Sequence, residues 1–271
     1  MKLFLIFVLL IIFVYIVHGV FSVPKLNRNW VSDQKILAEV SIDGDLITIK
    51  NIRNISYRSA EDFDVAFYDK TFKLEDLKTA WYIVEPFGQI GAAHTFVSFE
   101  FYDGSYLAIS PEIRREQGEK FSVLKGVFRQ YELVYIIADE FDVIKLRTKH
   151  RRHEVRLFPI KADQKIMQQV FMDMLERAEK LATEPEFYNT IANNCATNIM
   201  KHVRKFSDKA IPWWDVRYLL PEYSDKIAYD ADILNSDLPI DEARQYFSIS
   251  DKAKRCSEKD FSSCIRPLQR N

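Results

Sequence analysis

The sequence predicts an α+β fold in which an antiparallel sheet packs against helices. Three observations lead to this class. β-prone runs dominate residues 36–160. Asp-Gly pairs at residues 43–44 and 103–104 separate such runs, as in hairpins. From Asp163 to Thr183, apolar residues recur at helical spacing. A block of strands followed by helices is typical of α+β folds.

The individual elements follow from the same patterns. Strands are expected at residues 36–42, 46–52, 79–84, 93–102, 106–111, 131–138, 143–148 and 154–160. Helices are expected at residues 74–78, 163–183, 195–205 and 242–247. The apolar stripe of the 163–183 helix is interpreted as core packing and not as a site.

Composition excludes several classes of function. The chain has 271 residues, of which 48% are hydrophobic, with 38 basic and 39 acidic side chains. This length favours one large domain, and the balanced charge argues against a general nucleic-acid binder. With seven glycines and no Gly-rich phosphate loop, no nucleotide site is expected. No cofactor and no metal are expected either, because His150 and His153 lack convincing partners in the sequence.

The N-terminus differs from the rest of the chain. Leu3–Val17 is an unbroken apolar run whose length fits a transmembrane helix with some flank. A cleaved signal peptide is the alternative, but no small-residue cleavage site follows the run. We therefore expect an uncleaved anchor in residues 1–22, a main domain in residues 30–235 and a C-terminal tail in residues 236–271.

The three cysteines indicate the compartment. Cys256 and Cys264 are close enough in sequence for a loop disulfide, which leaves Cys195 as an unpaired thiol. An anchor and one disulfide together favour an oxidising space outside the cytoplasm. Three free thiols in the cytoplasm remain the alternative.

Cys195 is the candidate nucleophile. Asn193 and Asn194 are strong N-cap residues, so Cys195 is expected in the first turn of a helix. There the helix dipole favours a thiolate and lowers the thiol pKa. The alternative is a small buried apolar side chain, as most free cysteines are.

His94 is the candidate base, because His202 lies about two helical turns from Cys195. A three-residue loop at residues 103–105 would pair Phe101 with Leu107 and would set His94 opposite Arg114.

In that register His94, Ser110 and Glu112 share the sheet face that points away from Phe99. Glu112 or Ser110 could then orient the imidazole, and Glu112 is preferred because a carboxylate stabilises imidazolium better. An ordinary polar strand face is the alternative.

Together these residues predict thiol-based acyl transfer. Cys195 would attack a carbonyl, His94 would remove the thiol proton, and Glu112 or Ser110 would hold the ring. The N–H of Cys195 would help to bind the oxyanion. Because His94 precedes Cys195, the order argues for a permuted papain-like arrangement, in which the Cys195 helix packs on the sheet face that carries His94.

A run of ordered motifs resembles a known family. The motifs are Ala93-His94-Thr95-Phe96-Val97-Ser98-Phe99, Ile109-Ser110-Pro111-Glu112-Ile113-Arg114-Arg115-Glu116, Phe128-Arg129-Gln130-Tyr131-Glu132-Leu133, Asp139-Glu140-Phe141-Asp142-Val143-Ile144-Lys145-Leu146-Arg147, Pro185-Glu186-Phe187-Tyr188-Asn189-Thr190 and Asn193-Asn194-Cys195-Ala196-Thr197. They resemble the Lnb N-terminal periplasmic domain family of bacteria over roughly residues 47–234. The resemblance implies a periplasmic, membrane-associated bacterial protein and no established substrate.

We therefore expect a single-pass protein of the bacterial inner membrane with its bulk in the periplasm. Its expected activity is that of a thiol hydrolase or acyltransferase acting on an amide or ester of the cell envelope, with a cell-wall peptide or a lipid as substrate. A non-catalytic envelope scaffold or binding module with the same fold is the alternative, so enzymatic activity stays open.

Two further clusters have simpler interpretations. The basic run at residues 147–153 could bind anionic lipid head groups, but a solvated hairpin turn is favoured. Its first arginine, with Arg114 and Arg115, could instead form structural ion pairs with Glu112, Glu116 and Asp142. Aromatic residues at 213–223 are expected to pack helices onto the sheet and not to line a cleft for a sugar or a peptide.

Overall fold

The computed structural model describes residues 6–7, 22–88, 91–209, 211 and 215–267. The expected anchor, Leu3–Val17, lies almost wholly outside these residues, as do Trp213 and Trp214. Within the described ranges, no helix is both long enough and apolar enough to cross a membrane.

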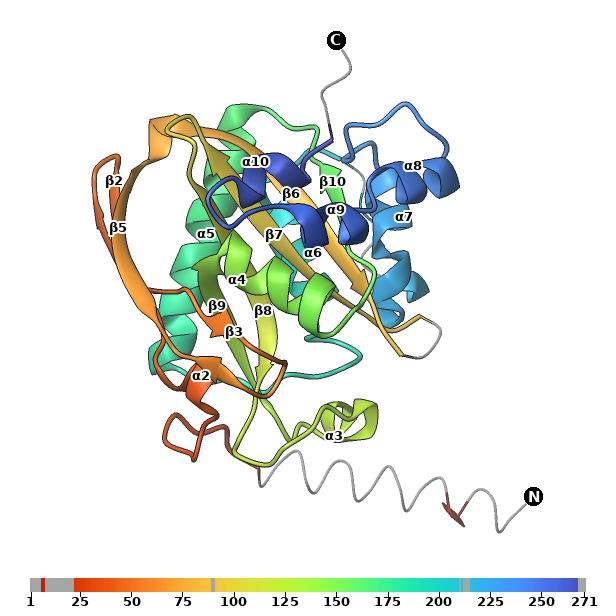
Figure 1. Ribbon diagram of the computed structural model, residues 1–271. Helices are drawn as coiled ribbons and strands as arrows, with labels where there is room; N and C mark the ends of the chain where they lie inside the picture. The colour runs from red at the N-terminus through yellow and green to blue at the C-terminus, as the bar shows by residue number, and fades with distance from the viewer. Residues whose placement is uncertain (1–5, 8–21, 89–90, 210, 212–214, 268–271) are drawn as a thin grey trace.

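An eight-stranded sheet forms the centre of the molecule (Figure 1). Its strand order is β1-β2-β9-β8-β7-β6-β10, and β5 pairs with β2. Neighbouring strands are antiparallel except for a short parallel contact between β2 and β9. The strands are β1 (Glu39–Asp43), β2 (Leu46–Arg53), β5 (Phe67–Lys73), β6 (Leu77–Pro86), β7 (Ala93–Phe101), β8 (Tyr106–Arg114), β9 (Glu132–Asp139) and β10 (Arg156–Pro159), and a separate small sheet pairs β3 (Ser56–Tyr57) with β4 (Phe63–Asp64).

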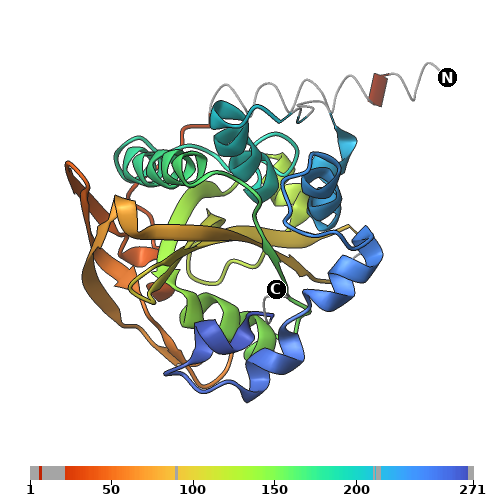
Figure 2. The same cartoon turned by 90° about the horizontal axis from the view of Figure 1, so that it is seen from above.

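Helices cover both faces of the sheet, which gives three layers (Figure 2). On one face, α5 (Gln164–Thr183), α6 (Cys195–Phe206), α7 (Ser224–Asp230) and α8 (Ile240–Tyr246) enclose the larger core. On the other face, α4 (Glu140–Lys145), α9 (Ser250–Arg255) and α10 (Phe261–Ile265) enclose a smaller core. Short helices α2 (Ser32–Lys35) and α3 (Val123–Val127) and the 3-10 turns η1 (Leu74–Asp76), η3 (Val216–Leu219) and η4 (Pro221–Tyr223) complete the fold. The α+β prediction, with a sheet packed against helices, is confirmed.

The predicted strand at residues 143–148 is wrong. The chain there forms α4 and then a π-helical turn, η2 (Leu146–His150). Asp139 starts the helix, because its carboxylate accepts a hydrogen bond from the N–H of Phe141 at 2.8 Å. The sequence pattern was misleading because Asp142 and Arg147 are buried by ion pairing, so their polarity does not mark a solvent-facing position. The expected hairpin turn at residues 147–153 is wrong for the same reason.

The register of the β7–β8 hairpin differs from the prediction by two residues. Phe99 pairs with Leu107, and Val97 pairs with Ile109. The Asp103 carboxylate accepts a hydrogen bond from the N–H of Ser105 at 2.8 Å, and the N–H of Phe101 donates to Ser105 O at 3.0 Å, so the loop lies one residue earlier than predicted, at residues 102–104. A shift of two leaves every side chain on its expected face.

The C-terminal segment packs against the smaller core. A disulfide joins Cys256 to Cys264 with a Cα–Cα distance of 5.9 Å, so the predicted pairing is confirmed. Ala253 and Phe261, from the two helices that flank this disulfide, are fully buried on the sheet. The disulfide therefore closes a loop whose two ends both contribute to the core.

A buried ion pair ties the end of β2 to α4. Arg53 donates two hydrogen bonds of 2.9 Å to Asp142, which also accepts from the N–H of Ile55 at 2.9 Å.

Arg53→Ala is expected to destabilise the fold by about 3–5 kcal/mol, because it leaves a buried carboxylate without its counter-ion. Urea unfolding measures the loss. The matched control is Arg58→Ala, since Arg58 pairs with Asp62 and Asp64 at the surface and should have no measurable effect. Equal effects of the two changes would contradict the ion pair's role.

Candidate functional site

Cys195 occupies the first position of α6. The carboxamide of Asn194 accepts a hydrogen bond from Thr197 N at 2.9 Å, and Asn194 N donates to Thr197 Oγ1 at 2.9 Å. This capping box fixes the start of the helix at the cysteine. Before it, Asn189 accepts hydrogen bonds from the N–H groups of residues 191 and 192, which closes the preceding turn. The predicted helix start is confirmed.

The thiol of Cys195 is buried, with 4% of the residue exposed. Burial raises its pKa, and this outweighs the hydroxyl and N–H of Thr95 and the N–H of Ala196, which lower it. The low pKa expected from the helix terminus is therefore wrong, because the helix terminus also faces the protein interior. At neutral pH the resting group is the thiol and not the thiolate.

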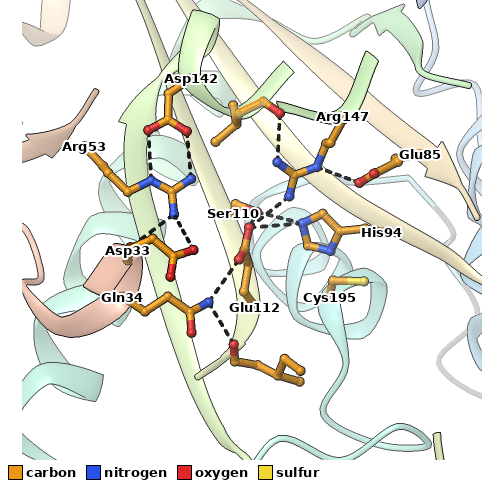
Figure 3. A network of polar contacts seen from close by, with 12 residues as sticks. Asp33, Gln34, Arg53, Glu85, His94, Ser110, Glu112, Asp142, Arg147 and Cys195 are labelled. Atoms are coloured by element: carbon orange, nitrogen blue, oxygen red, sulfur yellow. Dashed lines mark hydrogen bonds and ion pairs between the residues drawn. The ribbon is translucent and has the colours of Figure 1, made fainter. Parts of the chain in front are cut away.

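His94 forms a hydrogen-bonded chain with two residues of β8. Its Nε2 lies 2.7 Å from Ser110 Oγ, and Ser110 Oγ donates to Glu112 Oε1 at 2.9 Å (Figure 3). Nε2 is 3.6 Å from the same carboxylate oxygen, so Ser110 makes the direct contact and Glu112 stands behind it. Both residues proposed as the orienting group therefore take part: Ser110 contacts His94, and Glu112 contacts Ser110.

Arg147 holds Glu112 ionised. Its guanidinium donates to Glu112 Oε1 at 3.0 Å, to Glu85 Oε2 at 2.6 Å and to Val143 O at 2.9 Å. Burial raises the pKa of Glu112, but the charges around it, of which Arg147 contributes most, together outweigh burial, so the pKa ends well below its usual range. Gln34 Nε2 donates to the second carboxylate oxygen at 3.3 Å.

This pairing determines the tautomer of His94. An ionised carboxylate only accepts hydrogen bonds, so the single hydroxyl proton of Ser110 points to Glu112. Ser110 Oγ must then accept from His94, which places the imidazole proton on Nε2. Burial and the charge of Arg147 lower the pKa of His94 to about 4, so the ring is neutral near pH 7. Nδ1 is left as an unprotonated nitrogen.

His94 and Cys195 line one cavity of about 250 Å³, together with Glu112, Arg147 and Tyr188. Cys195 Sγ is 4.0 Å from the carbonyl oxygen of Ala93, the residue before His94. In Figure 3 the Cys195 side chain lies beneath the His94 ring, on the side opposite the Ser110 contact, and its sulfur points past the ring.

The expected packing of α6 is wrong. Its residues Ile199 and Met200 join the core that contains Phe99, which is the sheet face opposite to His94. Cys195 lines the same cavity as His94 because it sits on the first turn of the helix, at the end of the sheet where β7 begins. Arg114, expected opposite His94, instead places its guanidinium over the ring of Trp30 at 4.5 Å.

Comparison with known families identifies residues 64–222, which match the model of the Lnb N-terminal periplasmic domain. The chain belongs to this family. The resemblance predicted from the sequence motifs is therefore confirmed, and the Lnb N-terminal periplasmic domain places the protein in the periplasm of a bacterium. No curated protein and no solved structure matches the chain.

Sequence reasoning missed part of this candidate site. Arg147 was assigned to a surface cluster, and the pairing with Glu112 was only one of its alternatives. Glu85 and Gln34 were not singled out, because each lies in a segment that contains no motif of its own. In the described part of the chain, no group of three or more His, Cys, Asp or Glu side chains could hold a metal ion.

The low pKa of His94 predicts a component of acid sensitivity. The folded pKa is about 4 and the unfolded value about 6.5, so the folded state disfavours protonation. This stability is fully present above pH 6.5 and is lost as the pH falls towards 4, by about 3 kcal/mol at most. The free energy of unfolding should therefore drop more between pH 7 and pH 4.5 in the wild type than in His94→Gln. Parallel curves would show that His94 is not held neutral by the fold.

Proposed function

We propose that the chain is a membrane-anchored periplasmic thiol hydrolase or acyltransferase that acts on an amide or ester of the cell envelope. The proposed nucleophile is Cys195 and the proposed base is His94. The observation that supports this best is the series of hydrogen bonds from Arg147 through Glu112 and Ser110 to His94. It leaves Nδ1 of His94 unprotonated on the side of Cys195. A neutral imidazole with a free nitrogen is what a resting thiol needs as a proton acceptor.

The reaction begins with a neutral thiol and a neutral imidazole. As Sγ attacks the carbonyl carbon of the substrate, the thiol proton moves to Nδ1 and an S–C bond forms. Collapse of the tetrahedral intermediate breaks the C–N or C–O bond, and the imidazolium returns its proton to the leaving amine or alcohol. Water or an acceptor amine or alcohol then attacks the thioester, which releases the acyl group and restores the thiol.

Ser110 and Glu112 have positioning roles in this scheme. When Nδ1 takes the thiol proton, Nε2 keeps its own and donates to Ser110 Oγ, so the imidazolium faces a hydroxyl polarised by a carboxylate. The helix start supplies the N–H groups of Cys195 and Ala196 near the sulfur, where they could stabilise the oxyanion. A nucleophile at a helix start and a base on a strand that precedes it in the chain support a permuted papain-like arrangement.

For the rest of the chain, we propose an uncleaved inner-membrane anchor in residues 1–22, with a cell-wall peptide or lipid as substrate. The basis is the apolar run Leu3–Val17, together with the periplasmic family. Such an anchor would keep the site near the membrane surface.

A non-catalytic envelope scaffold is the second candidate. The raised pKa of Cys195 and the orientation of its sulfur past the His94 ring favour it, because neither is arranged for catalysis at rest. The catalytic proposal requires the sulfur to turn towards Nδ1 when substrate enters. The two candidates therefore differ in the reactivity of the thiol.

Alkylation of Cys195 tests the catalytic proposal, because Cys256 and Cys264 are joined in a disulfide and leave one thiol to label. Between pH 6 and 8, iodoacetamide should label Cys195 faster than a model thiol. His94→Gln should slow labelling by about 10²-fold or more, in line with the loss of a general base. Mass spectrometry after timed quenching measures both rates.

The matched control is His150→Gln, which removes a histidine whose ring contacts Tyr57 outside the cavity and should leave the rate unchanged. Cys195 reacting no faster than the model thiol, with no effect of His94→Gln, would favour the scaffold. Profiling wild type and Cys195→Ala with electrophiles of different acyl type would then identify the acyl group accepted.

A further inference from the structure

Two arginines lie at the same cavity as Cys195 and His94 and have no role in the scheme above. Arg115 lies directly after β8 and Arg151 directly after η2, and both line the cavity. Their side chains are 30% and 35% exposed, whereas that of Arg147 is buried. Both guanidinium groups can therefore meet a molecule that enters from solvent.

The carboxylates of the cavity are already engaged and turned inward. Glu85 is 1% exposed and receives hydrogen bonds or close ionic contacts from Arg147 and from His153 Nδ1, each at 2.6–2.7 Å. Glu112 is held by Arg147 and Ser110. Asp33 lies 3.3 Å from Arg115 and is itself mostly buried. The charge that the cavity presents to an incoming group is therefore cationic.

Arg151 has the least protein contact of the two. Its ionic contact is to Glu85 at 3.9 Å, which is beyond hydrogen-bond distance. Within the described ranges of the chain, none of its five guanidinium N–H groups donates a hydrogen bond to a protein acceptor. Burial and the nearby charge of Arg147 lower its pKa, yet an arginine remains charged near neutral pH. Arg151 therefore holds a forked set of donors with capacity for an oxyanion.

We propose that this cavity contains an anion subsite, in which Arg151 and Arg115 bind a carboxylate or phosphate group of the substrate beside the bond that Cys195 attacks. The assignment rests on the proposed function and adds the chemical class of the substrate to it. A guanidinium fork matches two oxygens of either anion.

Two phenylalanines contribute apolar surface to the same cavity. The ring of Phe87 stacks on His153 at 5.9 Å and meets Phe121 edge-on at 6.0 Å. Both phenylalanines line the cavity. Limiting water around the arginines strengthens their attraction for an anion. An apolar part of the substrate can lie against the same rings.

A pair of alkylating reagents tests the subsite. Iodoacetate is anionic and iodoacetamide is its neutral analogue, and both alkylate Cys195 with loss of iodide. The quantity measured is the iodoacetate rate divided by the iodoacetamide rate. We expect this ratio to be about tenfold higher for Cys195 than for a model thiol. A tenfold change in rate corresponds to about 1.4 kcal/mol, which is about the contribution of one charge-assisted hydrogen bond. Arg151→Gln and Arg115→Gln should each lower the ratio several-fold, and the iodoacetamide rate in the denominator corrects for any general change in thiol reactivity.

The matched control is Arg152→Gln, which removes the same charge one residue away from Arg151, from a side chain that is exposed and does not line the cavity. It should leave the ratio unchanged. A wild-type ratio equal to that of the model thiol, or equal effects of the changes at 151 and 152, would overturn the subsite. Slow labelling by iodoacetamide itself would instead count against the nucleophile, so the two failures are distinct.

A second measurement does not depend on the thiol. Thermal unfolding of Cys195→Ala is followed with inorganic phosphate or acetate, against chloride at equal ionic strength. If phosphate raises the unfolding temperature and Arg151→Gln removes this increase, the subsite binds a phosphate group. The same result with acetate supports a carboxylate. Stabilisation by neither anion would overturn the proposal.

Discussion

The guanidinium of Arg147 is buried between Glu85 of β6 and Glu112 of β8, and the arrangement of the site depends on this contact. A buried charge is tolerated only when it is paired and hydrogen-bonded, so Arg147 fixes where both carboxylates lie. Because Arg147 keeps Glu112 ionised, Ser110 must donate to Glu112 and accept from His94. One ion pair thereby determines which nitrogen of the imidazole is free.

The sequence was sufficient for the features that depend on local spacing. Alternation along β7 and β8 placed His94, Ser110 and Glu112 on one face, and this survived an error of two residues in the register because side chains repeat every two residues. The start of α6 was predictable because Asn194 is a strong N-cap residue, and in the structure it caps the helix. The family could be recognised because its motifs are spread in order along most of the chain.

The remaining features depend on contacts between distant residues. Residues 143–148 were interpreted as a strand, since ion pairing over 60 or more residues buries Arg147 and the neighbouring Asp142 and disguises the helical pattern. The face on which α6 packs could not be derived from its own sequence, because Cys195 sits at the sheet's end and can approach His94 from the opposite layer. Burial of the thiol, which sets its pKa, likewise comes from the assembled core.

The tautomer and titration of His94 test this account most directly. Nitrogen-15 NMR of the histidine side chains distinguishes a protonated from an unprotonated ring nitrogen, and His94→Gln assigns the signals. The account predicts that at pH 7 His94 carries its proton on Nε2, that Nδ1 is unprotonated, and that the ring titrates well below the usual histidine range, near pH 4. A proton on Nδ1 at pH 7, or a pKa of about 6.5 as in an unperturbed histidine, would contradict it.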